Sequence, residues 1–173
     1  MVEEPRRYRY VGPPDLRAAA PRGESGRPIR SGADFDAWAA TVPDRDLAEP
    51  FTFVVDTAGT LRLAPRRSEH VACAGGGEVL AAGEIAFACR PSGWAVTEVT
   101  NQSTGYCPDA SCWPAVAAAL DHAGLPHPPA FTAALTFRRC PDCGERNVVK
   151  DDDFTCAVCG GDLPRRWNVA PDT

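Results

Sequence analysis

The chain has 173 residues, a formal net charge of −5 and an isoelectric point near 5.2. This length suits one medium-sized domain with a small appendage, and the acidic balance argues against a dedicated nucleic-acid-binding protein, which is usually basic. No apolar run approaches the roughly 20 residues that span a membrane, and the first residues lack the apolar core of a signal peptide. Eight cysteines without a secretion signal are more typical of metal ligands or free thiols than of disulfides. We therefore expect a cytoplasmic protein that does not associate with membranes.

Residues 1–50 form an N-terminal segment rich in arginine and proline. Residues 8–11 alternate like a short strand, and residues 15–20 can form one or two helical turns. Farther along, Phe35 and Trp38 lie on one face of a short amphipathic helix, so we expect both to pack into the core. The arginines of this segment suit a solvated surface better than a phosphate-binding one.

Residues 51–137 form a β-rich main domain. Turn signatures at 56–59 and 90–93 indicate hairpins between neighbouring strands. The predicted strands are 51–55, 60–63, 78–82, 84–89, 94–99 and 131–137. A helix is predicted at 112–123, where Pro114 lies in the first turn.

The last part of the chain, residues 138–168, contains two Cys-x-x-Cys pairs separated by twelve residues: Cys140, Cys143, Cys156 and Cys159. Two such turns place four thiolates around one metal ion in the tetrahedral arrangement that zinc prefers. A glycine follows each pair, at positions 144 and 160, where the chain must turn back with positive φ. The pattern predicts a zinc ribbon with one structural Zn²⁺, because four thiolates leave no open coordination position. Two disulfides or an iron centre are the alternatives.

These segments together predict an α+β fold. It consists of an antiparallel β-meander sheet with one or two short helices, followed by the C-terminal zinc ribbon. Within the ribbon, residues 147–150 and 154–156 are expected to form short strands around an acidic turn. Because strand 131–137 leads directly into the ribbon, we expect the ribbon to extend from the sheet and not to hang on a flexible linker.

Two loops of the main domain, 66–77 and 101–108, are richer in polar groups than plain hairpin connections. Loops at strand ends commonly form binding sites, so we take their side chains as candidate ligand- or partner-binding residues. They are Glu69, His70, Asn101, Ser103, Thr104 and Tyr106. The three glycines at 75–77 can present backbone N–H groups to an anion or can simply form a loose turn. Residues 101–104 can equally satisfy their own backbone as turn residues.

The run AGGGEVLAAGE at 74–84, a strand pair, and the run NQSTGYCP at 101–108 carry a resemblance. Residues 69–113 resemble a β-rich domain found in bacterial polymorphic toxin and effector proteins and in plant IQ-motif calmodulin-binding proteins, with the approximate pattern HSSFLAGGxVxAAGE and NxSGHYxP. The matching residues are Ala74, Gly75, Gly76, Val79, Ala81, Ala82, Gly83, Glu84, Asn101, Ser103, Tyr106 and Pro108. This chain departs from the pattern at 69–71, where Glu-His-Val replaces His-Ser-Ser, and at Gly105, which replaces the second histidine. The resemblance implies a site within 69–106 but no particular activity, and without an IQ motif it does not imply calmodulin binding.

A second metal site would require one histidine and three cysteines from the main domain: His70, Cys73, Cys107 and Cys112. We do not favour it, because the Cys-x4-Cys spacing is less common and a free cysteine is an ordinary core residue. The same residues lack the Pro-Cys-x-x-Cys turn of a zinc deaminase. A cysteine nucleophile paired with His70 is also conceivable, but no local pattern demands it.

Three functions remain open. The favoured one is a zinc-binding bacterial protein that acts as a binding or adaptor module and recognises a protein or small ligand through loops 66–77 and 101–108. The alternative is an effector-type enzyme acting on a nucleotide-like or protein substrate, with residues of the same loops in its cleft. A nucleic-acid-binding ribbon is a further alternative and would use the ribbon arginines, Arg138, Arg139, Arg165 and Arg166.

Overall fold

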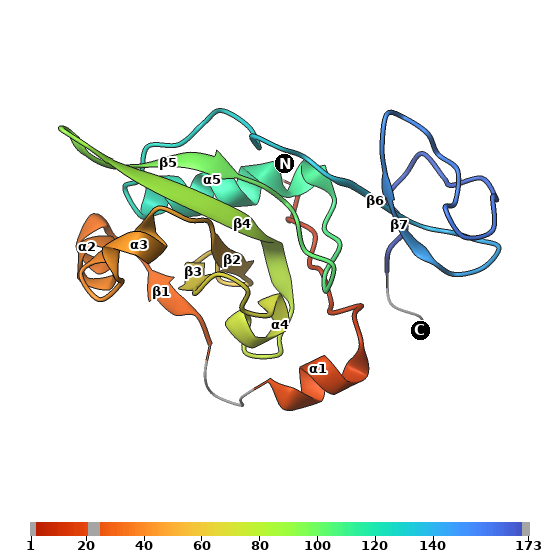
Figure 1. The fold of residues 1–173 in the computed structure, drawn as a ribbon, viewed down its shortest axis with the longest axis horizontal. Coiled ribbons are helices and arrows are strands. Elements are labelled where there is room, and N and C mark those ends of the chain that lie inside the picture. The colour runs from red at the N-terminus through yellow and green to blue at the C-terminus, as the bar shows by residue number, and fades with distance from the viewer. Residues whose placement is uncertain (1–2, 21–24, 171–173) are drawn as a thin grey trace.

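A five-stranded antiparallel sheet lies at the centre of the molecule, and a two-stranded sheet lies at one end of it (Figure 1). The structure is a computed structural model and describes residues 3–20 and 25–170. The strands of the large sheet are β1 (Arg27–Ile29), β2 (Phe51–Asp56), β3 (Leu61–Ala64), β4 (Val79–Arg90) and β5 (Gly93–Val99). Those of the small sheet are β6 (Thr136–Arg139) and β7 (Arg146–Val149). Of the predicted segment 1–50, residues 1–2 and 21–24 lie outside the described residues.

Short helices accompany the large sheet. They are α1 (Pro14–Ala19), α2 (Gly32–Ala39), α3 (Asp44–Leu47), α4 (His70–Cys73) and α5 (Trp113–His122), with a 3-10 turn, η1 (Ala110–Cys112), before α5. The predicted α+β class, with an antiparallel sheet and a C-terminal cysteine cluster, is confirmed.

The strand order is β1-β3-β2-β4-β5. Consecutive strands pair in the β2–β3 and β4–β5 hairpins, but β2 lies between β3 and β4, so the connection carrying α4 passes over β2 to reach its far side. This is the one step at which the large sheet departs from a simple meander between β2 and β5. The strands predicted at 78–82 and 84–89 are one continuous strand, β4.

The main core is formed by the large sheet and by aromatic side chains of α2. Phe35 and Trp38 are both buried, as predicted, and their ring centroids are 5.4 Å apart. Phe35 also contacts Phe87 of β4 at 4.8 Å. The first five residues of β2 are all buried, because the strand is central in the sheet and contacts both α4 and α5.

Gly83 in β4 allows an unusually close approach of two segments. A Cβ atom at this position would lie 1.9 Å from the carbonyl oxygen of Thr100, far inside any van der Waals contact. Only a residue without a side chain therefore fits here. The contact holds the start of the predicted loop 101–108 against the middle of β4.

The predicted strand 131–137 is wrong in its first part, because β6 begins only at Thr136. Upstream of it, Thr132 bonds the backbone of Val99 through both its N–H and its hydroxyl, and the N–H of Leu135 donates to the Asn101 side chain. One backbone bond and several side-chain bonds thus stand in place of a regular strand ladder. The predicted strand 154–156 likewise makes only isolated bridges, since β7 pairs with β6 instead.

Candidate metal centre

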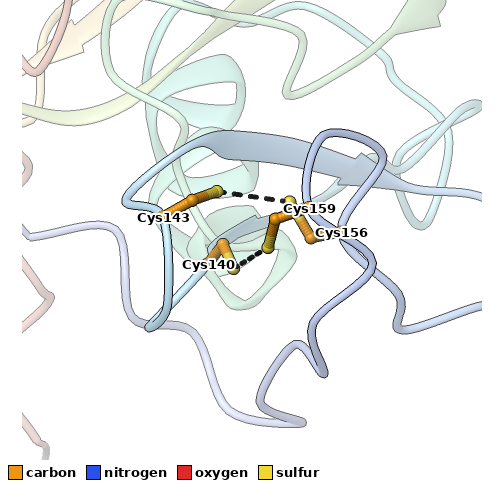
Figure 2. A group of neighbouring side chains, drawn as sticks. All are labelled: Cys140, Cys143, Cys156 and Cys159. Carbon is orange, nitrogen blue, oxygen red and sulfur yellow. Dashed lines mark hydrogen bonds between the residues drawn. The ribbon is translucent and has the colours of Figure 1, made fainter.

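Four cysteine thiols meet at the end of the two-stranded sheet (Figure 2). The sulfurs of Cys140, Cys143, Cys156 and Cys159 all lie within 4.8 Å of one another. The separations are 3.5 Å for Cys140–Cys159 and 3.6 Å for Cys143–Cys156. They exceed the ~2.05 Å of a disulfide bond and approach the roughly 3.8 Å expected between thiolates that hold zinc tetrahedrally at about 2.3 Å. The arrangement fits a single metal ion held by four sulfurs.

The two Cys-x-x-Cys turns have the same backbone structure. In the first, the N–H of Gly144 donates to the carbonyl of Cys140 at 2.9 Å, and in the second the N–H of Gly160 donates to that of Cys156 at 3.0 Å. Both glycines have positive φ, +79° and +75°, as the sequence predicted. Each turn therefore directs its two sulfurs to one side because glycine lets the chain reverse beneath them.

Asn147 connects the two turns, and sequence reasoning missed it. This buried residue of β7 donates from Nδ2 to the sulfur of Cys156 at 3.4 Å and to the carbonyl of Glu145 at 3.1 Å. Its Oδ1 accepts the N–H of Ala157 at 3.0 Å. The sequence did contain a signal for this role, because Asn147 is an amide residue on a predicted strand between the two cysteine turns.

The surroundings of Cys156 favour its thiolate form. Hydrogen bonds from the backbone N–H groups of Cys159 and Val158 lower the pKa of Cys156 to about 6, and the amide of Asn147 acts in the same direction. Since a metal ligand must be deprotonated, this thiol is prepared for coordination near neutral pH.

The ribbon, residues 138–168, is fixed to the main domain through Trp167. Its indole N–H donates to the carbonyl of Cys107 at 2.7 Å, and its ring lies edge-on to that of Tyr8 at 5.3 Å. The guanidinium of Arg6 lies 4.8 Å above the same ring. The chain leaving the ribbon is therefore tied to both the N-terminal segment and loop 101–108.

Two further residues, Asn168 and Arg138, hold the strands of the ribbon to its end. The side chain of Asn168 bonds both the N–H and the carbonyl of Arg139, at 2.8 and 2.7 Å. The buried guanidinium of Arg138 donates to the carbonyls of Phe137, Pro164 and Arg165. The donors of Arg138 thus serve the fold, and not an exposed phosphate-binding surface.

The predicted loops 66–77 and 101–108 lie side by side, because the hydroxyl of buried Tyr106 donates to the carbonyl of Gly77 at 2.7 Å. Asn101 is also buried and donates to the carbonyls of Pro108 and Leu135. The buried polar side chains of loop 101–108 therefore bond to the chain itself.

The other candidate residues divide between buried and exposed positions. Ser103 is buried, and its hydroxyl accepts the N–H of Tyr106 at 3.3 Å. A ring nitrogen of His70 lies 2.8 Å from the carbonyl of Gly83, and burial lowers the pKa of this histidine. Glu69 and Thr104 are exposed and present their side chains to solvent.

The glycines at 75–77 end helix α4. The N–H of Gly76 donates to the carbonyl of Val71 at 2.8 Å and that of Gly75 to Ala72 at 3.0 Å, with positive φ at both glycines. This is a Schellman-type helix end, in which N–H groups are used within the chain. They are therefore not directed at an anion.

Gly105, which replaces a histidine of the pattern discussed above, faces Tyr10. A Cβ at this position would lie 2.9 Å from the Tyr10 ring. The ring of Tyr10 is also 5.8 Å from that of Tyr106 and edge-on to it. Tyr10 therefore takes the space into which a side chain at 105 would project.

The cysteines of the main domain are placed differently from those of the ribbon. Burial raises the pKa of Cys73 and Cys112 to about 12 and that of Cys107 to about 11. Over residues 3–20 and 25–170, a metal ion could be shared by a group of three or more His, Cys, Asp or Glu side chains in one place. The ribbon cysteines form the only such group in these residues.

Comparison of the chain with protein-family models, with curated proteins and with solved structures found no match. Within the part of the chain that the structure describes, no helix combines the length and the apolar character needed to cross a bilayer.

Proposed function

We propose that this protein is a binding module whose fold is completed by one structural Zn²⁺. The observation that carries the proposal is the convergence of four cysteine sulfurs within 4.8 Å. Four protein thiolates fill a tetrahedral zinc ion and leave no position for a substrate or a reactive water. The metal would therefore stabilise the ribbon and would not take part in catalysis.

The binding surface that we propose is formed by loops 66–77 and 101–108. The bond between Tyr106 and Gly77 joins the loops, and Gly83 holds the second loop against the sheet, so the surface is well supported. Glu69 and Thr104 are its exposed candidates. A supported surface loses little conformational freedom on binding, which favours recognition of a ligand or partner protein.

We favour binding over catalysis because the cysteines that could act as nucleophiles, Cys73 and Cys107, are buried. Burial raises the pKa of the Cys73 and Cys107 thiols to about 12 and 11, so both are protonated near neutral pH. His70, the base that either would need, is engaged with the carbonyl of Gly83. These contacts support a structural role for all three side chains.

Native mass spectrometry of the freshly purified full chain tests the metal. We expect one zinc ion per chain and a colourless protein. A visible absorption band from iron, or a chain without metal that is fully folded, would overturn the zinc assignment. A second metal or a retained nucleotide would favour the enzyme alternative.

Photo-crosslinking tests the binding surface. A photoreactive amino acid at Thr104 is expected to give an adduct of defined mass in cells, because this exposed side chain lies on the proposed surface. The same amino acid at exposed Ala40, which follows α2, serves as the control. Equal labelling at both positions, or none at Thr104, would contradict the surface.

A further inference from the structure

A cavity of about 460 Å³ lies between the N-terminal segment and the ribbon. Its N-terminal side includes Tyr10 and Val11, its ribbon side includes Arg139 and Arg146, and Val169 just after the ribbon also lines it. This volume falls within the range of small-ligand sites, and the lining combines an apolar part with a few polar groups, as such sites do.

The basic part of the cavity comes from two arginines in direct cross-strand register. Arg139 of β6 pairs with Arg146 of β7, so their side chains leave the same face of the small sheet. Both guanidinium groups line the cavity. Arg146 is exposed and forms no ion pair with any residue in 3–20 or 25–170, including its neighbour Glu145, which also lines the cavity.

The charge of Arg146 acts on residues outside the ribbon. It opposes the effect of burial on the pKa values of Tyr10 and Cys107, so its guanidinium lies within electrostatic reach of both. Arg146 thus belongs to the junction and not only to the outer face of the ribbon.

The apolar part of the cavity centres on Tyr10. Its hydroxyl donates to the carbonyl of Pro13 at 2.9 Å, and its ring lies edge-on to that of buried Tyr106. The N–H of Val11 donates to the carbonyl of Gly105 at 2.7 Å and anchors this wall to loop 101–108. The ring is therefore fixed in place beside the two arginines.

We propose that this cavity binds a small ligand whose oxyanion lies against Arg139 and Arg146 and whose aromatic or apolar body lies against Tyr10. Guanidinium groups bind the oxygens of carboxylates and phosphates through paired N–H donors, and an aromatic wall accepts a flat apolar group. The oxyanion is a phosphate monoester or a carboxylate. This site lies outside the surface proposed above, so it adds to the proposed function.

Titration of the zinc-loaded full chain with phenyl phosphate, benzoate and inorganic phosphate, followed by calorimetry, tests the proposal. We expect saturable binding, and we expect Arg146→Gln to weaken it about tenfold or more, because one guanidinium–oxyanion contact is lost. Arg166→Gln removes the same charge from an exposed arginine of the ribbon outside the cavity, and should leave affinity unchanged.

Tyr10→Leu tests the second half of the site. It should remove the preference for phenyl phosphate over inorganic phosphate while leaving the inorganic anion bound. Tighter binding of phenyl phosphate than of benzoate would identify the ligand as a phosphate ester, and the reverse order would identify a carboxylate.

Two results would overturn the proposal: no saturable binding of any probe at millimolar concentration, or equal weakening by Arg146→Gln and Arg166→Gln. Zinc content and melting temperature measured on the same samples show whether each variant is folded. They also separate a failure of this proposal from a failure of the zinc assignment.

Discussion

The ribbon and the paired loops 66–77 and 101–108 both gather polar or reactive side chains, but they use them in opposite ways. In the loops, Asn101 and Tyr106 bond to backbone groups of the same chain. In the ribbon, four sulfurs all lie within 4.8 Å of one another, and the contacts between them are sulfur pairs at 3.5 and 3.6 Å. A cluster of groups that the chain does not satisfy indicates a ligand, whereas a satisfied cluster indicates a fold.

Removing one thiol should have the largest effect. Cys143→Ser leaves three thiolates, and because metal binding supplies roughly 10 kcal/mol or more of folding energy in small zinc modules, we expect the ribbon to lose its structure. Zinc content and the melting temperature measure this. Cys89→Ser, at an exposed cysteine outside the cluster, is the control. A Cys143→Ser protein with unchanged zinc and melting temperature would refute the metal site.

Removing the buried side-chain amide of Asn101 in loop 101–108 should have the next largest effect. Asn101→Ala removes two donated bonds and leaves the N–H of Leu135 without its acceptor, which we expect to cost about 2–4 kcal/mol in the free energy of unfolding. Urea denaturation of the zinc-loaded protein measures it. Gln102→Ala, at the adjacent exposed position, should change stability by less than about 0.5 kcal/mol. Similar losses in both variants would show that the buried amide is not special.

A smaller effect is expected at Asn147, the buried amide inside the ribbon. Asn147→Ala removes the amide that bonds the Cys156 sulfur, and loss of such a supporting contact typically weakens metal binding about 10–100-fold. Competition with a zinc chelator measures the affinity. Val148→Ala, at the partly exposed position beside it, should bind zinc normally. If Asn147→Ala also binds zinc normally, the amide serves only the backbone.

The smallest expected effect is on how the stability of the protein depends on pH, through His70. Burial lowers the pKa of His70 below its ordinary 6.5, so the unfolded chain takes up a proton more readily than the folded one as pH falls. The stability associated with neutral His70 is full above pH 6.5 and is lost as pH falls from there through the lower folded value. His70→Gln should therefore lose less stability than wild type on acidification, as followed by urea denaturation. His122→Gln, at an exposed histidine, should behave like wild type; identical pH profiles for all three proteins would exclude the effect.

What the sequence could predict depends on local patterns. Residues close together in the chain predicted three features: the convergence of the four ribbon cysteines, the positive φ of Gly144 and Gly160, and the burial of Phe35 and Trp38. The β2–β3 and β4–β5 hairpins belong to the same class.

What it could not predict depends on distant partners. Residues 131–135 have the composition of a strand, but their partners are Val99 and the side chain of Asn101, more than thirty residues away. The bond from Trp167 to Cys107 spans sixty residues. Polar residues of one loop can be either buried or exposed, and the sequence does not distinguish the two cases. The structure shows that Asn101 is buried and that Thr104 is exposed.

The attachment of the ribbon at both of its ends has one more consequence. Leu135, before the ribbon, is held by Asn101, and Trp167, near the end of the ribbon, is held by Cys107 and Tyr8. A protease that cuts the metal-free ribbon between these two anchors would therefore release no fragment from the native protein. The two pieces would stay together as a nicked complex, separating only in denaturant, and Trp167 would remain docked on residues to which its piece is no longer covalently joined.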